Sequence, residues 1–232
     1  MTTFVLVHGS WHGAWCWDRL IPELEALGHR GVAMDLPIED PAAGLAEYAE
    51  IVAPFIPDAS AILVGHSLGA AVIPLVAAKH GVQRMVFLCP VVRRLGMSIA
   101  EQAPLDADIS TYDLGTGRTF FDDSSSAWEP EAAIAAFFPD CDPDTARWAA
   151  SRLRRQYWRY WEEPNPLTEW PDVERSAIVC TEDQIIGIDW ARRRIPELLG
   201  VTPIELPGGH SPFLSHPTEL AAALVADLHP AG

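Results

Sequence analysis

Basic residues are scarce in this sequence of 232 residues. Sixteen lysines and arginines stand against 32 aspartates and glutamates, which gives a formal net charge of −16 at pH 7. A surface with this balance repels nucleic acid and anionic lipid, so we expect neither nucleic acid nor a membrane as a partner. The charge decides little else, because an acidic surface is also a common route to solubility.

Paired cysteines are also missing. The four cysteines follow no C-x-x-C spacing, and Cys89 and Cys180 each end an apolar run, as buried thiols often do. This pattern predicts neither a disulfide framework nor a zinc site. The N-terminus, MTTFVLVHGS, lacks the basic segment and the long apolar core of a secretion signal, so we expect a cytoplasmic location.

An uninterrupted membrane-spanning segment is absent as well, although residues 62–78, ILVGHSLGAAVIPLVAA, are almost entirely apolar. Gly65, Gly69 and Pro74 are poor residues for the interior of one continuous helix. Two shorter elements explain the run better, a buried strand over 61–66 followed by a buried helix over 68–80. Ser67 then lies at the turn between them.

Short β-branched runs alternate with helical patterns along most of the chain. Alternation of this kind, with strands that are apolar almost throughout, is typical of a mostly parallel α/β sheet with helices on both faces. Strands are predicted over 4–8, 31–35, 61–66, 84–89, 177–180 and 202–206. Helices are predicted over 16–27, 44–55, 68–80, 190–199 and 217–228.

Residues 91–176 interrupt the alternation and differ in composition. They contain aspartate-rich turns, several prolines and five tryptophans, and residues 132–138 and 143–158 have helical character. We therefore predict one core domain, formed by residues 1–90 and 177–232, into which residues 91–176 are inserted as a mostly helical cap.

The turn between the buried strand and the buried helix has the pattern G-x-S-x-G, formed by Gly65, Ser67 and Gly69. A turn this tight strains the serine backbone and exposes its hydroxyl, and the glycines let strand and helix approach closely. The helix also directs free N–H groups toward the same hydroxyl. The motif alone also fits a plain turn of small residues, but its position between strand and helix predicts a nucleophile elbow.

Two later loops supply partners for such a serine. His210 follows the last predicted strand in the segment LPGGHSPF, where the alternative is a loop histidine on a polar surface. Asp183 follows the strand of the segment IVCTEDQIIGIDW and is favoured over Glu182 and Asp189, the latter read as a helix N-terminal acid. The order Ser67, Asp183, His210 is the triad order of hydrolases with a nucleophile elbow.

The chemistry of these residues follows from their types. Serine is a weak nucleophile, so His210 would take its proton during attack while Asp183 holds the imidazole tautomer. The oxyanion needs N–H donors, expected from the backbone of Leu68 and from the loop after the first strand, VHGSWHGAW. His8 and His12 in that loop are expected to make structural hydrogen bonds rather than to bind a metal.

At this point the chain resembles a known family. The segments FVLVHGSWHGAWCW, DLP at 35–37, GHSLGA and FFPDCDPDTARWAASRLRRQ are similar to the plant-type esterase and hydroxynitrile lyase family and its bacterial relatives. The resemblance covers nearly the whole chain and implies an α/β-hydrolase fold with a small helical cap and no cofactor. By matching positions, it implies a triad of Ser67, Asp183 and His210, with backbone N–H groups of Ser10 and Leu68 as the oxyanion hole.

Two positions depart from the lyases of that family. Those lyases place a threonine where this chain has Gly9 and a lysine where it has Ser211. Without these groups, nothing is predicted to hold a cyanohydrin hydroxyl or to accept departing cyanide. We also expect Gly9 to leave open a space in which an ester group can sit.

The cap and the loop after the first strand offer aromatic side chains for an apolar pocket, which suits an aromatic or fused-ring ester. The alternative is that most of these rings only pack cap helices onto the core. The residues predicted to line the pocket are Gly9, Trp11, Trp128, Phe137, Trp158 and Ser211. Four cap arginines are expected to pair with surface acids rather than to bind a carboxylate: Arg152, Arg154, Arg155 and Arg159.

Three functions are compatible with these observations. The leading prediction is a serine hydrolase of small apolar or aromatic esters, including methyl esters or lactones, that works through an acyl-enzyme without cofactor or metal. The alternatives are a hydroxynitrile lyase-type C–C lyase and a nearly inactive small-molecule binding protein of the same fold. The sequence is compatible with a homodimer and does not decide the oligomeric state.

Overall fold

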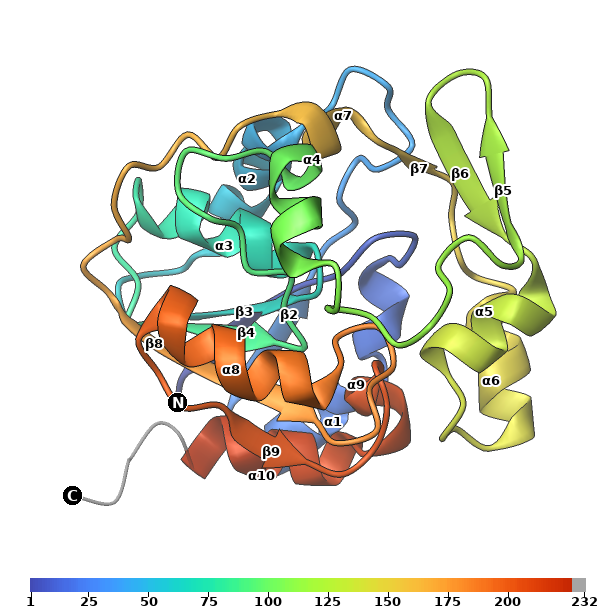
Figure 1. Cartoon of the computed structure of the whole chain (residues 1–232). Helices are drawn as coiled ribbons and strands as arrows, with labels where there is room; N and C mark the ends of the chain where they lie inside the picture. The colour runs from blue at the N-terminus through green and yellow to red at the C-terminus, as the bar shows by residue number, and fades with distance from the viewer. Residues whose placement is uncertain (227–232) are drawn as a thin grey trace.

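The computed structural model describes residues 1–226. Its centre is a six-stranded sheet with the order β2-β1-β3-β4-β8-β9, whose neighbouring strands run parallel (Figure 1). The predicted parallel α/β sheet is therefore confirmed. Its strands are β1 (Thr3–Val7), β2 (Arg30–Ala33), β3 (Ile62–His66), β4 (Arg84–Leu88), β8 (Glu174–Cys180) and β9 (Ile204–Leu206).

Helices cover the sheet on both faces. The pair α2 and α3 lies above the strands in Figure 1, and the pair α1 and α10 lies below them. The helices around the sheet are α1 (Leu20–Ala26), α2 (Leu45–Val52), α3 (Gly69–Ala77), α8 (Ile188–Leu199), α9 (Pro212–Ser215) and α10 (Pro217–Ala226). Two 3₁₀ turns accompany them, η1 (Ala14–Trp17) and η2 (Ala53–Phe55).

The strand register brings the ends of several strands to one edge of the sheet. Val7 of β1 pairs with Gly65 of β3, and Leu88 of β4 pairs with Ile178 of β8. β1, β3 and β4 are buried along their whole length, as their apolar sequences require. Loops that follow the carboxyl ends of parallel strands meet at the same edge, where α/β proteins bind their ligands.

The segment between β4 and β8 contains more helix than strand, and it also contains strands that were not predicted. It contains a three-stranded antiparallel sheet, β5-β6-β7, that stands with α5 and α6 beside the core (Figure 1). Its elements are α4 (Ile99–Gln102), η3 (Ala103–Asp106), β5 (Arg118–Phe121), β6 (Ser125–Trp128), α5 (Pro130–Phe137), α6 (Pro143–Ala150), β7 (Gln156–Tyr157) and α7 (Arg159–Glu162).

Several predicted boundaries differ from the structure, and three of the differences change an element. The helix expected over 143–158 ends at Ala150, because residues 156 and 157 pair with β6 instead. The helix expected over 16–27 is a 3₁₀ turn followed by α1. The core was expected to resume at residue 177, but β8 begins at Glu174. The last two residues of the helix predicted over 217–228 lie outside the described residues.

No helix within residues 1–226 is both long enough and apolar enough to cross a membrane. The apolar run at 62–78 is split between β3 and α3, as the sequence predicts. Both elements are buried over their whole length, so the run serves the interior of the core.

Candidate active site

Ser67 lies at the turn between β3 and α3 and has a backbone φ of 50°. This left-handed conformation is strained for a residue with a side chain, and hydrogen bonds on both sides of the residue maintain it. The Ser67 N–H donates to the Leu88 carbonyl (3.0 Å), and the Ser67 carbonyl accepts from the N–H of Val91 (3.2 Å). The turn thus has the geometry predicted for a nucleophile elbow.

The two glycines of the motif are required by close backbone contacts. A Cβ on Gly65 would lie 2.5 Å from the carbonyl oxygen of Gly69 and 2.7 Å from the N atom of Ala70. A Cβ on Gly69 would meet the carbonyl oxygens of Val7 and His8. Backbone atoms cannot move aside as flexible side chains can, so strand β3, helix α3 and the loop after β1 pack this tightly only with glycine.

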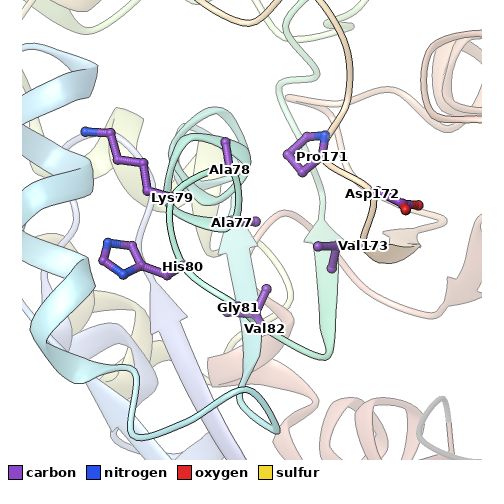
Figure 2. A pocket seen from close by; sticks show the side chains of 9 residues that line it. All are labelled: Ala77, Ala78, Lys79, His80, Gly81, Val82, Pro171, Asp172 and Val173. Carbon is purple, nitrogen blue, oxygen red and sulfur yellow. The ribbon is translucent and has the colours of Figure 1, made fainter.

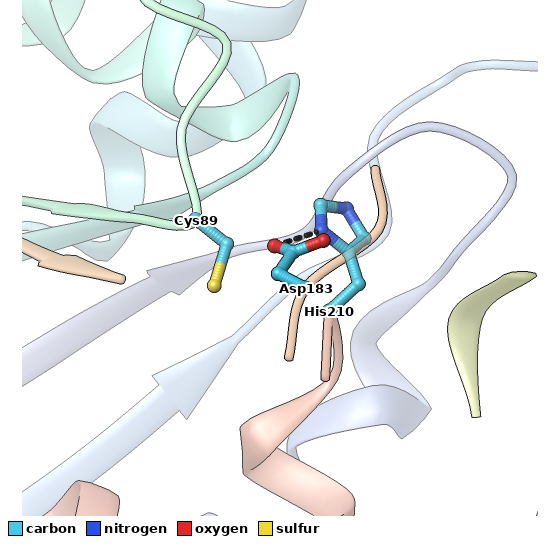
Figure 3. Close-up of side chains that lie close together, drawn as sticks. All are labelled: Cys89, Asp183 and His210. Carbon is cyan, nitrogen blue, oxygen red and sulfur yellow. Dashed lines mark hydrogen bonds and ion pairs between the residues drawn. The ribbon is translucent and has the colours of Figure 1, made fainter. Parts of the chain in front are cut away.

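Asp183 and His210 form a buried hydrogen-bonded pair. His210 Nδ1 donates to Asp183 Oδ2 (2.8 Å), and the side chains are 2% and 1% exposed (Figure 3). The other carboxylate oxygen, Oδ1, accepts from the N–H groups of Ile185 (2.8 Å) and Ile186 (2.9 Å). These bonds fix the carboxylate, which in turn fixes the Nδ1–H tautomer and leaves the Nε2 lone pair of His210 to act as a base.

The competing acids are placed differently. Glu182 is exposed on the surface. Asp189 opens helix α8 with a side chain that is 86% exposed and lies 3.8 Å from Arg192. Of the three acids considered, the structure brings only Asp183 to His210, and the assignment of a catalytic role to it stays a prediction.

His66 connects the elbow to the His210 loop. Its Nε2–H donates to the backbone carbonyl of His210 (2.9 Å), and the two imidazole rings are 4.6 Å apart between centroids. Burial lowers the pKa of His66 well below its ordinary value, so the ring is neutral and serves as a fixed spacer next to Ser67. The sequence analysis did not assign this role, although the position of His66 directly before the serine was a usable signal.

The loop after β1 is held by two buried histidines, as expected for structural hydrogen bonds. The N–H of Leu36 donates to His8 Nε2 (2.9 Å), so the proton of this imidazole is on Nδ1, which donates to the Gly9 carbonyl (2.8 Å). His12 Nδ1 donates to the Ser10 carbonyl (2.7 Å). Burial lowers the pKa of His8 to about 4 and that of His12 to about 3, so both rings are neutral.

The bond from His8 also determines where the Ser10 N–H points. In a planar trans peptide the carbonyl of one residue and the N–H of the next point in opposite directions. Because His8 holds the Gly9 carbonyl, it holds the Ser10 N–H on the other side of that peptide. Ser10 also bonds through its side chain to the Tyr160 hydroxyl (3.1 Å). The predicted oxyanion donor is therefore anchored on two sides, by His8 and by the inserted segment.

The expectation of open space at Gly9 is wrong. A Cβ at this position would lie 2.9 Å from His66 Nδ1 and 2.9 Å from the Ser67 Cβ. The loop passes so close to the elbow that even a methyl group would displace one of these side chains. Gly9 therefore allows the loop after β1 to pack closely against Ser67, and it does not leave open space for a substrate.

The aromatic residues predicted to line the pocket do come together. The Trp11 ring lies 5.6 Å from Trp128, 5.8 Å from Phe137 and 5.4 Å from Trp158, between ring centroids. Phe137 is in turn 6.0 Å from the His210 ring. Trp11 itself has a φ of 61° and directly follows Ser10. We call these four rings the aromatic cluster; their contact with substrate stays a prediction.

Ser211 and Cys89 complete the surroundings of His210. Ser211 is fully buried, and its hydroxyl has no hydrogen-bond partner among the described residues. Cys89, Asp183 and His210 place three ligand-type atoms within 4.8 Å of one another (Figure 3). A hydrogen bond with Cys180, together with burial, raises the pKa of Cys89, and His210 Nδ1 is already bonded to Asp183. A protonated thiol and an occupied imidazole nitrogen do not suit a metal ion.

Two surface cavities do not reach Ser67. One, of about 400 Å³, is lined by the end of α3 and by residues 171–173, and it contains none of the predicted site residues (Figure 2). The other, of about 440 Å³, lies beside Asp183 and is bordered by Asp108 and Arg193, which form an ion pair. Neither contains Ser67, so we assign the reaction to neither cavity.

Comparison with known proteins supplies a family. The model described as Alpha/beta hydrolase family matches residues 4–223. Salicylic acid-binding protein 2 of Nicotiana tabacum is 29% identical, covering 97% of this chain and 96% of its own length. Probable esterase PIR7A of Oryza sativa is also 29% identical, covering 96% and 95%. The crystal structure of a pyrethroid hydrolase from Sphingobium faniae matches with a TM-score of 0.82 and 25% identity, covering 99% and 98%.

Proposed function

The chain belongs to the alpha/beta hydrolase family, and we propose that it cleaves small apolar or aromatic carboxylic esters through an acyl-enzyme formed on Ser67. The relatives include a probable esterase and a pyrethroid hydrolase, and the chain is a carboxylic ester hydrolase. The proposed mechanism rests on the buried 2.8 Å hydrogen bond from His210 to Asp183, together with the strained strand-to-helix turn at Ser67, whose neighbour His66 lies 4.6 Å from the His210 ring.

In the first half of the proposed reaction, the Ser67 oxygen attacks the ester carbonyl while His210 Nε2 takes its proton. The carbonyl oxygen becomes an oxyanion that accepts hydrogen bonds from the N–H groups of Ser10 and Leu68. The bond to Asp183 stabilises the imidazolium. Collapse of the intermediate breaks the bond to the alcohol oxygen, which receives the proton from His210, and leaves Ser67 acylated.

In the second half, water replaces the alcohol. His210 takes a proton from water as the water oxygen attacks the acyl carbon, and the same two N–H groups donate hydrogen bonds to the new oxyanion. Collapse releases the carboxylic acid and returns the proton to Ser67. The balance is one ester and one water consumed, and one acid and one alcohol formed, with no oxidant, cofactor or metal required.

The test uses purified full-length enzyme. Hydrolysis of p-nitrophenyl acetate and butyrate is measured together with labelling by a fluorophosphonate probe, with Ser67→Ala as the control. We expect labelling of the unsubstituted enzyme alone, and a loss of roughly three to six orders of magnitude in kcat for Ser67→Ala. A folded Ser67→Ala enzyme that is equally active would refute the acyl-enzyme, and absence of turnover and labelling in the unsubstituted enzyme would favour a binding protein.

A second arm of the same experiment addresses the lyase alternative. Ser211 provides no positive charge for departing cyanide, and the position of Gly9 has no side chain for a cyanohydrin hydroxyl and no room for one. A missing cation in a low-dielectric site costs several kcal/mol, which corresponds to roughly three orders of magnitude in rate. We expect no cyanide release from mandelonitrile above the buffer rate. Ser67-dependent release as fast as ester hydrolysis would establish the lyase instead.

A further inference from the structure

The arginines of this acidic protein are mostly neutralised by neighbouring carboxylates. Three of the four cap arginines considered from the sequence follow this pattern. Arg154 pairs with Glu39 (2.9 Å), and Arg155 pairs with Asp123 (2.7 Å). Arg159 pairs with Glu163 (2.7 Å). The fourth, Arg152, lies exposed on the surface with its guanidinium 4.7 Å from the Trp148 ring centre.

Arg118, which begins β5, departs from this pattern. Among residues 1–226 no carboxylate forms an ion pair with it, and its buried Nε atom has no hydrogen-bond partner there. Instead the guanidinium lies 5.5 Å from the centre of the Trp11 ring, 5.8 Å from Trp128 and 5.2 Å from Trp158. Burial lowers the pKa of Arg118, yet a guanidinium keeps its charge in proteins.

Two more donors around the same cation lack acceptors. The indole N–H groups of Trp128 and Trp158 are buried and have no partner within the described part of the chain. The Trp11 indole, by contrast, donates to Ser126 (3.2 Å). Buried donors are nearly always paired in native proteins, because a buried donor without a partner loses its hydrogen bonds to water and gains none in return. The Nε atom of the cation and these two indole N–H groups, all without a partner among residues 1–226, form a site that complements an anion.

This group of donors adjoins the proposed reaction centre. Trp11 directly follows Ser10, whose N–H is the predicted oxyanion donor, and the Arg118 guanidinium lies 5.5 Å from the centre of the Trp11 ring. Phe137 bridges the aromatic cluster to His210, at 5.8 Å from Trp11 and 6.0 Å from the His210 ring. A substrate whose ester lies at Ser67 can therefore place a second group along the aromatic cluster, against the cation.

We propose that Arg118, with the indole N–H groups of Trp128 and Trp158, binds an ionised carboxylate of the substrate at a distance from the scissile ester. The preferred substrates are then monoesters of dicarboxylic acids or esters of hydroxy acids, with an apolar linker lying on the aromatic cluster. This inference rests on the proposed ester hydrolysis and specifies its substrate class. Guanidinium and carboxylate form strong, charge-assisted hydrogen bonds in a site with little water.

Matched ester pairs test the proposal in both halves of the substrate. Monomethyl adipate is compared with methyl heptanoate, and 6-acetoxyhexanoate with heptyl acetate, so each pair differs in the carboxylate at nearly constant length. The kcat/KM of each ester is measured by acid release in a pH-stat. We expect the enzyme to prefer the charged member of at least one pair, and Arg118→Met to lower kcat/KM for that member roughly ten- to hundredfold. The neutral member should change less than about threefold.

Three further variants separate anion binding from packing. Arg118→Lys keeps the charge and should retain part of the preference even if Arg118→Met folds poorly. Trp158→Phe keeps a smaller aromatic ring but removes the indole N–H, and should reduce the preference several-fold. Arg152→Met removes a guanidinium that also lies on a tryptophan, but outside this group, and should leave all four rates unchanged.

Two results would overturn the proposal. The first is the absence of a charge preference in the unsubstituted enzyme. The second is an equal loss for charged and neutral esters in Arg118→Met, which would assign Arg118 to packing of the aromatic cluster. In either case Ser67-dependent hydrolysis of the neutral esters would leave the proposed function standing, whereas its absence would refute the proposed function itself.

Discussion

At the scale of single residues, the geometry of the site depends on the tautomer of His8 and on the orientation of the peptide between Gly9 and Ser10. The buried imidazole of His8 receives an N–H from Leu36 and gives one to the Gly9 carbonyl, so it determines the direction of the Ser10 N–H. The sequence predicted a structural role for this histidine but not that it acts through one particular peptide. That assignment needed both hydrogen bonds, because the tautomer follows from one and the peptide direction from the other.

Substitutions of His8 test whether this histidine orients the Ser10 N–H. We expect His8→Ala to lower kcat roughly ten- to hundredfold with little change in KM, because a mobile Ser10 N–H stabilises the oxyanion less in the transition state. His8→Asn keeps an N–H donor near the position of Nδ1 and should retain more of the rate. The measurement is steady-state ester hydrolysis beside circular dichroism. Full activity in a folded His8→Ala enzyme would show that the Ser10 peptide needs no such support.

The acid partner of His210 gives a second prediction at this scale. Asp183→Asn should fold normally but lose on the order of 10³- to 10⁴-fold in kcat, because an amide no longer enforces the Nδ1–H tautomer. Asp189→Asn is the matched control, since that side chain is 86% exposed and should be dispensable. Ester hydrolysis by both variants decides between them. A crippled Asp189→Asn beside an active Asp183→Asn would reverse the assignment.

At the scale of elements, the core followed from the sequence better than the inserted segment did. The strands β1, β3 and β4 are almost entirely apolar and buried, so periodicity located them and α3 to within a few residues. Gln156 and Tyr157 carry no such signal, because their strand exists only through pairing with Ser125 and Ser126. Tertiary pairing of this kind overrides local pattern, and it explains why a helix was expected through residue 158.

The candidate site shows the same division. The strand ends and glycine turns of the core carry motifs, so Ser67, Asp183 and His210 were predicted before any geometry was known. Arg118 carries no motif, and its position among three tryptophans arises from the pairing of β5 with β6 and the approach of both to the loop after β1. No local pattern predicts that an arginine will lie against three tryptophan rings without an ion pair among the described residues.

The close contact between β3 and α3 at Gly65 gives a prediction at the scale of elements. Gly65→Ala should lower the free energy of unfolding by about 1–3 kcal/mol or more, because its Cβ meets the backbone of Gly69 and Ala70. Gly81→Ala is the matched control, since its Cβ would meet only the Ala59 side chain at an ordinary 3.6 Å. Thermal unfolding of both variants is the measurement. Equal melting temperatures would mean that helix and strand separate at little cost.

At the scale of the whole molecule, three neutral histidines are enclosed in a strongly acidic protein. His8, His12 and His66 are at most 1% exposed, and burial is the main cause of their lowered pKa values. His8 and His12 lie in the loop after β1 and His66 directly precedes Ser67, so the candidate site is built on groups that must stay uncharged. Each gains a proton on unfolding once the pH falls below the ordinary value of 6.5.

These lowered pKa values predict that the folded state loses stability as the pH is lowered. Above pH 6.5 these imidazoles are neutral in both states and contribute no pH dependence. Between pH 6.5 and about 4 the unfolded chain binds protons that the folded chain does not bind. The free energy of unfolding therefore decreases by about 1.4 kcal/mol for each histidine and each unit by which the pH is lowered. Three such groups together cost several kcal/mol by pH 5, a large share of the stability of an ordinary domain.

The contribution of one histidine can be isolated. His12→Asn keeps an N–H donor near the Ser10 carbonyl but cannot be protonated, so the loss of stability between pH 6.5 and pH 5 should shrink by about 2 kcal/mol. His80→Asn removes an exposed histidine and should leave that loss as it is in the unsubstituted enzyme. Urea unfolding at both pH values gives the free energies directly. If the two variants lose stability equally, the His12 imidazole is protonated within the folded protein, and the neutral support inferred for the oxyanion loop must be abandoned.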